Sequence, residues 1–428
     1  MSDKNNDEVL LRVEHLCQYF KNTKAVDDVS FDIKKGEVFG LVGESGCGKS
    51  TTGRAIIKIY DITSGSIYFK GQRVSAGTMS YKQAIRDART ETKKALKELQ
   101  EDSKAHPGNR QANEEKAAQM KKDLETLVAE NRKQIQAAVF DQRNSDKEYV
   151  KKLVEQVTKE YEEKCKEESD PAKLAELKKK FRDDLRVAKK TRLITKIQMI
   201  FQDPIASLNP RMTVSEILVE PLIISGKYSR EEIEKKRKEL LDTVGMPKRY
   251  ANSYPHELDG GRRQRIGIGR ALALEPDFIV CDEPVSALDV SIQAQILNLL
   301  QDLQEERGLT YMFITHDLSV VKHISHDIMV MYLGQMVEQA PSDELFAHTW
   351  HPYTKALLSA IPVPNAHKRM QRILLKGEIT SPVNPAPGCR FYSRCPYACD
   401  ECRKPQVIEE IVPGHFISCC RAREINNL

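Results

Sequence analysis

Residues 38–51 have the sequence Val38-Phe39-Gly40-Leu41-Val42-Gly43-Glu44-Ser45-Gly46-Cys47-Gly48-Lys49-Ser50-Thr51, and this stretch decides the fold. Its apolar start predicts a short buried strand, and its end predicts the first turn of a helix. The spacing between them, G-x-x-x-x-G-K-[ST], is typical of a phosphate-binding loop. Glycines let backbone N–H groups approach phosphate oxygens, and the positive end of the following helix points at the same anion. The stretch therefore predicts a nucleotide site rather than an ordinary glycine turn.

The side chains of this loop have separate expected tasks. Lys49 is expected to reach the β- and γ-phosphates, and the Ser50 hydroxyl is expected to hold Mg²⁺. An aromatic side chain near residue 19 can stack on the adenine face, although an edge-strand aromatic that packs inward is the alternative. The predicted nucleotide contacts are Tyr19 (or Phe20), Gly43, Glu44, Ser45, Gly46, Cys47, Gly48, Lys49, Ser50 and Thr51.

The length and composition of the chain limit its domain count, its partner classes and its location. The chain has 428 residues, enough for two or three domains, and 30% of them are charged. The formal net charge of +5 is too small to argue for nucleic acid. No apolar run approaches the roughly 18 residues of a membrane span, and residues 1–7 are polar, unlike a signal peptide. The expected location is the cytosol, with membrane contact made through partner proteins.

A charged segment at residues 81–192 interrupts the α/β pattern. Apolar residues recur within it in steps of three and four, which predicts long helices that meet along a narrow seam, as in a coiled-coil hairpin. These residues are Leu124, Val128, Ile135, Val139, Val150, Val154, Val157, Tyr161, Leu174, Leu177, Phe181 and Leu185. The segment is interpreted either as a docking arm or as an insertion that simply faces water, as charged helical faces usually do.

Polar residues follow three later apolar strands. Gln202 follows strand 197–201, and His316 follows strand 310–315. Asp282 ends strand 278–282, and Glu283 comes directly after it. Strands of an α/β protein present such residues at the carboxyl edge of the sheet, where ligands bind. Asp282 is expected to hold Mg²⁺, and Glu283 to polarise an attacking water. His316 is expected beside the γ-phosphate.

In this order the motifs resemble the nucleotide-binding ATPases of ABC transporters over roughly 310 residues, everything but the charged insertion. The resemblance implies that 43–51 is Walker A, 278–282 Walker B, Glu283 the catalytic carboxylate and His316 the switch histidine. It also implies that Gln202 is the Q-loop glutamine, which contacts Mg²⁺ and senses the γ-phosphate, and that Asp289 is the D-loop aspartate. ATP and Mg²⁺ are the implied ligands.

A narrower resemblance is to the oligopeptide/dipeptide importers. It rests on residues 198–204, 265–268, His351-Pro352-Tyr353-Thr354 and the tail around Cys389 and Cys395. The chain is similar to the second of the paired ATPase subunits of such importers. Implied partners are another ATPase subunit, two transmembrane permease subunits and an external peptide-binding protein, with the chain at the cytoplasmic face of the membrane. The transported solute stays open among dipeptides, longer peptides and nickel chelates.

One motif departs from the family. Where Ser-Gly-Gly-Gln is usual in the signature loop, this chain has Asp259-Gly260-Gly261-Arg262. In a head-to-tail ATPase pair this loop faces the partner's ATP, and an ionised Asp259 repels the γ-phosphate unless Arg262 or an altered loop compensates. The expectation is an asymmetric heterodimer with one weakened site.

The tail contains a cluster of cysteines. Cys389, Cys395, Cys402 and Cys419 match the tail of the importer subfamily, which implies four thiolates around a [4Fe–4S] cluster. Four thiolates also suit zinc, although the wide spacing favours the cluster, and reduced thiols without metal are the third reading. Cys399 and Cys420 leave the ligand assignment open.

Together these features predict an α/β fold of the ABC P-loop type. Its expected parts are a first core segment at 1–80, the helical insertion at 81–192, a second core segment at 193–345 with a helical subdomain near 205–265, and a cysteine-bearing region at 346–428. The expected activity is ATP hydrolysis that energises peptide import. The alternatives are an ABC-type ATPase of DNA repair and a regulatory subunit that binds ATP with little hydrolysis.

Overall fold

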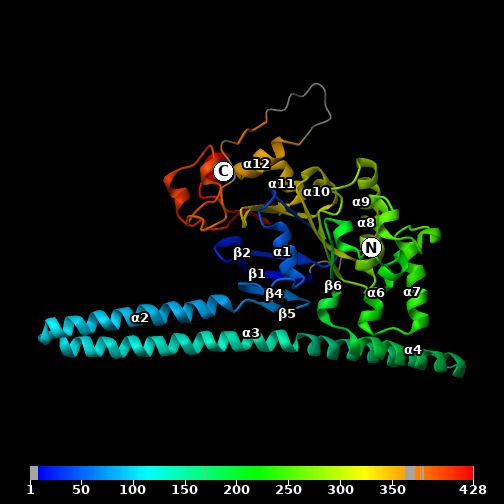
Figure 1. Cartoon of the computed structure of the whole chain (residues 1–428), viewed down its shortest axis with the longest axis horizontal. Coiled ribbons are helices and arrows are strands. Elements are labelled where there is room, and N and C mark those ends of the chain that lie inside the picture. The colour runs from blue at the N-terminus through cyan, green and yellow to red at the C-terminus, as the bar shows by residue number, and fades with distance from the viewer. Residues whose placement is uncertain (1–7, 169, 362–371, 376, 378–379, 428) are drawn as a thin grey trace.

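The computed structural model describes residues 8–168, 170–361, 372–375, 377 and 380–427, and it confirms an α/β cassette (Figure 1). Its strands are β1 (Val9–Phe20), β2 (Thr23–Lys34), β3 (Val38–Val42), β4 (Ser64–Phe69), β5 (Gln72–Ala76), β6 (Ile197–Ile200), β7 (Phe278–Asp282), β8 (Thr310–Thr315), β9 (Asp327–Tyr332), β10 (Gln335–Pro341), β11 (Glu409–Val412) and β12 (His415–Ile417). Its helices are α1 (Lys49–Ile56), α2 (Met79–Ala105), α3 (Arg110–Glu167), α4 (Pro171–Lys190), α5 (Pro204–Ser207), α6 (Val214–Ser225), α7 (Arg230–Thr243), α8 (Gly260–Leu272), α9 (Val290–Arg307), α10 (Leu318–Ile324), α11 (Ser342–Ala347), α12 (Pro352–Ser359) and α13 (Ala422–Asn426).

The larger sheet places the nucleotide motifs side by side. Its strand order is β11-β12-β10-β9-β3-β8-β7-β6, and the five strands from β9 to β6 are parallel. β3, which leads into the phosphate loop, lies between β9 and β8 in this parallel part and is buried along its whole length. β6, β7 and β8 are neighbours, so the residues that follow them gather at one edge of the sheet.

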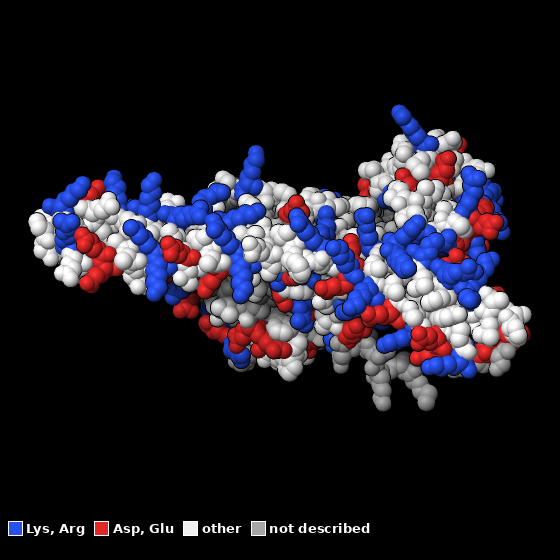
Figure 2. Space-filling view, turned by 90° about the horizontal axis from the view of Figure 1, so that it is seen from below, with Lys and Arg blue, Asp and Glu red and all other residues white. Residues whose placement is uncertain are grey.

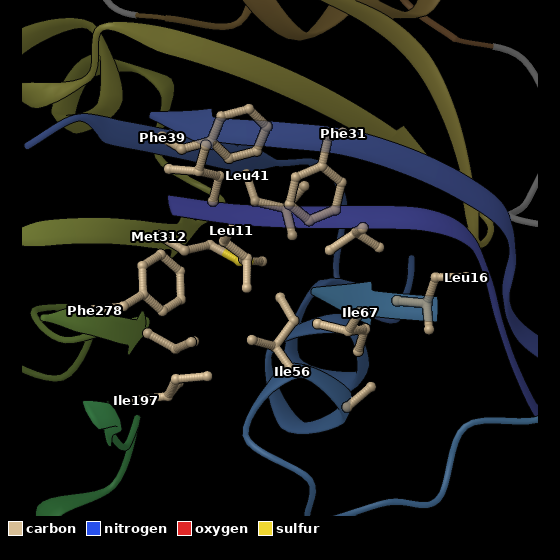
Figure 3. Close-up of a cluster of buried hydrophobic side chains, with 14 of the residues drawn as sticks. Leu11, Leu16, Phe31, Phe39, Leu41, Ile56, Ile67, Ile197, Phe278 and Met312 are labelled. Carbon is tan, nitrogen blue, oxygen red and sulfur yellow. The ribbon is translucent and has the colours of Figure 1, made fainter. Parts of the chain in front are cut away.

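A second, antiparallel sheet with the order β2-β1-β4-β5 packs against the first. Between them lies a hydrophobic core in which Phe31 stacks on Phe39 and α1 contributes Ile56 (Figure 3). Met312 of β8 and Phe278 of β7 reach this core from the larger sheet. Because α1 is fixed between two layers of buried side chains, the phosphate loop at its start is fixed as well.

The insertion is helical, as predicted, but the expectation of a single hairpin is wrong. One long helix, α3, pairs with α2 along its first half and with α4 along its second half (Figure 1). On the α2 side Asn113 Nδ2 donates to Asp102 Oδ2 at 2.7 Å, and on the α4 side Tyr161 stacks on Phe181 at 4.1 Å. The seam predicted from Tyr161 and Phe181 is therefore real, but it joins α3 to α4.

The middle of α3 is anchored on the cassette. Tyr149 is buried in the core between the sheets, and Gln142 Nε2 donates to the Ala76 carbonyl at 2.9 Å. Asp146 accepts the backbone N–H of Leu193 at 2.8 Å, just before β6. The insertion is thus attached at its centre and projects beyond the cassette at the α2 end (Figure 1).

The C-terminal region extends the main sheet. β12 pairs with β10, and β11 pairs with β12. His415 of β12 and Glu338 of β10 are fully buried and lie 3.0 Å apart, with Trp350 stacked on the imidazole. Within the described residues no helix has the length and apolar character that a membrane crossing requires.

Candidate nucleotide site

The phosphate loop has a conformation that only glycine adopts without strain. Gly48 has φ +102°, and a Cβ there would lie 2.3 Å from the Ala25 carbonyl oxygen. Lys49, the first residue of α1, is 5% exposed and donates from Nζ to the carbonyls of Gly43 at 2.7 Å and Glu44 at 3.0 Å. The lysine ammonium therefore lies within the loop, where it can neutralise phosphate charge.

A candidate cation site lies where α1 meets β7. The Ser50 hydroxyl donates to Asp282 Oδ1 at 2.6 Å, and Asp282 is fully buried. Its second oxygen, Oδ2, has no hydrogen-bond partner among the described residues; Arg54 Nη2 lies 3.7 Å away. Burial raises the pKa of Asp282, because a carboxylate without water is costly. A hydroxyl and an orphaned carboxylate oxygen at one point are ligands that suit Mg²⁺.

Three strand ends meet around Glu283. Gln202 Nε2 donates to Glu283 Oε2 at 2.9 Å, and His316 Nδ1 lies 3.2 Å from Glu283 Oε1. The Glu283 backbone has φ +45° and donates its N–H to the Ile314 carbonyl at 2.9 Å. This left-handed turn is unusual for glutamate and is a form of strain found at functional sites. The Glu283 carboxylate is thus held by Gln202 and His316, which follow β6 and β8, in a position to accept a proton from water.

The C-terminal region contacts the phosphate loop, which the sequence analysis did not anticipate. Arg394 donates from Nη1 to Glu44 Oε2 at 2.8 Å and from Nη2 to Glu44 Oε1 at 3.2 Å. The Glu44 N–H donates to the Tyr353 hydroxyl at 2.9 Å. Arg390 pairs with Asp27, which also accepts a hydrogen bond from the Tyr19 hydroxyl. The only available signal was that both arginines adjoin cysteines of the tail.

Tyr19 lies beside this network. Its hydroxyl is fixed by Asp27, and the Lys24 ammonium lies 5.2 Å from its ring centroid. Phe20, the alternative, is exposed and makes an edge contact with Tyr60. Stacking of either ring on adenine stays a prediction.

In the altered signature loop, Asp259 and Arg262 form an ion pair. Asp259 is the N-cap of α8: its Oδ1 accepts the Arg262 backbone N–H at 2.8 Å, and its Oδ2 pairs with Arg262 Nη1 at 2.5 Å. Aspartate caps a helix about as well as serine, so the local fold is kept. Gly260 lies against Leu288, and Gly261 lies against Ile292. Asp289, the exposed residue that precedes α9, adjoins Leu288 in the chain. Among the described residues, no hydrogen bond or ion pair joins this loop to residues 43–51.

The cysteines gather around Cys402. Its sulfur lies 3.7 Å from Cys399 Sγ and 3.8 Å from Cys420 Sγ, and these three form a group within 4.8 Å. The predicted set of Cys389, Cys395, Cys402 and Cys419 shares only Cys402 with this group. Burial raises the pKa of the Cys389 thiol to about 12. Burial also raises the pKa of the Cys395 thiol and that of the Cys419 thiol.

Comparison with known proteins adds independent evidence. A family model described as "ABC transporter" matches residues 26–154 and 176–286, and one described as "Oligopeptide/dipeptide transporter, C-terminal region" matches residues 337–402. The chain is similar to the oligopeptide transport ATP-binding protein AppF of Bacillus subtilis, with 39% identity over 429 residues that cover 97% of this chain and 98% of the relative. It is similar to OppF of the same organism, with 39% identity over 423 residues that cover 97% of both chains.

Proposed function

Because this chain belongs to the ABC transporter ATPase family, in its oligopeptide/dipeptide branch, we propose that it hydrolyses ATP to energise peptide import. The observation that carries the proposal is the position of Glu283, held by Gln202 and His316 at the strand edge that also presents the Ser50–Asp282 pair. This arrangement supports a reaction in which a proton acceptor and a cation act at one end of the phosphate loop.

Each residue has a task in this reaction. Lys49 and the loop N–H groups bind the β- and γ-phosphates, and Ser50 and Asp282 would hold Mg²⁺, which supplies positive charge there. Glu283 accepts a proton from the attacking water, while His316 orients the carboxylate and stabilises the developing charge. Gln202 links Glu283 to α5 and α6, so a change at the γ-phosphate can reach the helical subdomain.

The proposed assembly has four partner chains of three kinds: a second ATPase subunit, two transmembrane permease subunits and an external peptide-binding protein. The chain would then act as a peripheral subunit at the cytoplasmic face of the membrane. Purification from native membranes in mild detergent, with mass spectrometry of the co-purifying chains, tests this assembly. Two multi-span proteins and a second ATPase are expected; a chain that purifies alone or with nucleic acid would contradict it.

The signature loop gives a prediction about asymmetry. We infer that Asp259 weakens the site that it completes on the partner ATPase, because its carboxylate would face the γ-phosphate there. Asp259→Ser keeps the N-cap and is expected to raise steady-state hydrolysis by the assembled pair severalfold. Asp170→Ser, at the N-cap of α4, is the matched control. Unchanged or reduced hydrolysis in Asp259→Ser would show that the pair with Arg262 already neutralises this charge.

For the tail we propose a [4Fe–4S] cluster held by four of the six C-terminal cysteines, with zinc as the alternative metal. The grouped sulfurs of Cys399, Cys402 and Cys420 support a soft-metal site, and they include two cysteines outside the set first predicted. Anaerobic purification followed by iron, sulfide and zinc analysis is expected to find about four irons and four sulfides per chain. One zinc without iron, or no metal, would refute the cluster.

A further inference from the structure

The phosphate loop contains an acidic side chain, which is unfavourable in a site for a polyanion. Within residues 43–51, Glu44 is the one acid and Lys49 the one base, so their formal charges cancel. The phosphates of ATP keep a net negative charge when Mg²⁺ is bound, and a carboxylate in the same loop repels them. A cation from elsewhere in the chain would restore a net positive charge to the loop.

Arg394 supplies this cation from the C-terminal region. Its guanidinium donates to both carboxylate oxygens of Glu44, at 2.8 and 3.2 Å. Two parallel hydrogen bonds of this kind fix the direction of a carboxylate as well as neutralising its charge. Nη1 of Arg394 also donates to the Tyr332 hydroxyl at 3.3 Å, which ties the guanidinium to the end of β9. The Glu44 carboxylate is therefore neutralised by a residue from a distant part of the chain.

The Arg394–Glu44 pair is shielded from water, unlike the charges on the surface of the chain. Charged side chains of both signs are spread over the face of the molecule seen in Figure 2, where solvent screens them. The Arg394 side chain is instead 9% exposed, and that of Glu44 is 23% exposed. Charges with so little water around them interact strongly with their neighbours, so loss of Arg394 would leave an uncompensated carboxylate in the phosphate loop.

The pair also keeps the Glu44 carboxylate away from Lys49. The Glu44 carbonyl accepts a hydrogen bond from Lys49 Nζ at 3.0 Å, so the side chain of Glu44 starts close to that ammonium. Among the described residues, no ion pair joins the Glu44 carboxylate to Lys49. Without Arg394 the carboxylate would be free to pair with Lys49 and to occupy the ammonium that the phosphates need.

The segment that carries Arg394 has other anchors on the cassette. Phe391 is 1% exposed and packs edge-on against Tyr332, with ring centroids 5.3 Å apart. Arg390 pairs with Asp27, and its side chain is 4% exposed. These contacts do not involve the Arg394 guanidinium, so a substitution that removes its charge should leave the segment in place.

We propose that Arg394 is a positioning residue for ATP binding: it neutralises Glu44 and leaves Lys49 free to bind the phosphates. The proposal rests on the ATPase function proposed above and adds a residue of the C-terminal region to the nucleotide site. Arg394 acts through Glu44 and not on the nucleotide itself, so the expected effect is on ATP affinity rather than on the chemical step.

A double-mutant cycle on the full chain tests the proposal, with binding of ATP and Mg²⁺ measured by calorimetric titration. Arg394→Gln is expected to weaken ATP binding about tenfold, because the Glu44 carboxylate is then unpaired. Glu44→Gln is expected to bind ATP severalfold more tightly than the unmodified chain, because it leaves the positive charge of Arg394 unpaired. The double variant has neither charge and should recover most of the loss. Arg403→Gln, which removes an exposed tail arginine bonded to Tyr392, is the control and should bind ATP normally.

The order of these affinities separates charge compensation from a purely structural role. If Arg394 only held the loop in shape, Glu44→Gln would weaken ATP binding as well, and the double variant would bind no better than Arg394→Gln. Either result would overturn the proposal, as would an Arg394→Gln affinity within twofold of the unmodified chain. If urea unfolding showed that Arg394→Gln does not fold, the direction of the Glu44→Gln effect would still decide. Failure of the unmodified chain to bind ATP would instead refute the proposed function.

Steady-state hydrolysis by the assembled complex gives a second readout. Arg394→Gln should raise the KM for ATP about tenfold and change kcat less than twofold, because the residue acts on binding. Arg394→Lys keeps the charge and should retain most of the affinity. A loss confined to kcat, or an Arg394→Lys variant as weak as Arg394→Gln, would contradict charge compensation.

Discussion

Glu283→Gln is expected to lower steady-state ATP hydrolysis by the assembled complex about 100-fold or more, with ATP affinity nearly unchanged. Glutamine has almost the same shape as glutamate and keeps one oxygen for His316 or Gln202, but it cannot accept a proton from water. General-base catalysis contributes on the order of 10²- to 10⁴-fold, which sets the expected loss. Phosphate release measures turnover, and equilibrium binding of a fluorescent ATP analogue measures affinity.

The control for this variant is Glu306→Gln, an exposed glutamate at the C-terminal end of α9, the end opposite Asp289. It should leave both quantities unchanged. If Glu283→Gln also left turnover unchanged, Glu283 would not be the base, and catalysis in the complex would belong to the partner ATPase. A variant that lost ATP binding as well would indicate that Glu283 supports the site structurally.

Lys49→Ala is expected to weaken ATP binding about 10- to 100-fold, with hydrolysis falling in parallel. The ammonium is enclosed by the loop and bonded to the Gly43 and Glu44 carbonyls, so its charge acts on phosphate at short range and with little water. Charge-assisted hydrogen bonds contribute about 1.5 to 3 kcal/mol each, which corresponds to this change in affinity. Calorimetric titration with ATP and Mg²⁺ provides the measurement.

Lys35→Ala is the control, because Lys35 is an exposed lysine in the turn before β3. Urea unfolding of both variants without nucleotide separates binding from folding, since Lys49→Ala also removes a donor from two loop carbonyls. An ATP affinity within twofold of the unmodified chain in Lys49→Ala would contradict the assignment of the loop.

Family and site were predictable because their signals are local. The glycines and Lys49 occur at a spacing that any phosphate loop needs, and Asp282, Glu283 and His316 follow apolar strands directly. The rule that parallel strands present their carboxyl ends at one edge was enough to group these residues. The structure confirms that grouping and adds that Glu283 is the residue on which Gln202 and His316 converge.

Other features were set by contacts between segments that are far apart in the chain. The apolar steps of three and four in the insertion predict helices, but the same pattern fits one hairpin or two. The tertiary structure shows that α3 runs through as one helix, with Tyr149 buried in the core. Likewise, the spacing of the cysteines does not say which sulfurs meet. The turns of the tail bring Cys399 and Cys420 to Cys402, where the family pattern had named other partners.

The sequence by itself thus determined the nucleotide chemistry, because phosphate binding needs a few residue types at short, fixed spacing. The tertiary structure alone decided how the other segments of the chain are placed around the nucleotide site. Arg394 reaches Glu44 across 350 positions, and Lys190 of α4 donates to the Gly226 carbonyl at the end of α6. Such contacts depend on which surfaces pack together, and an arginine or a lysine that is ordinary in sequence gains its role from the charge and burial around it.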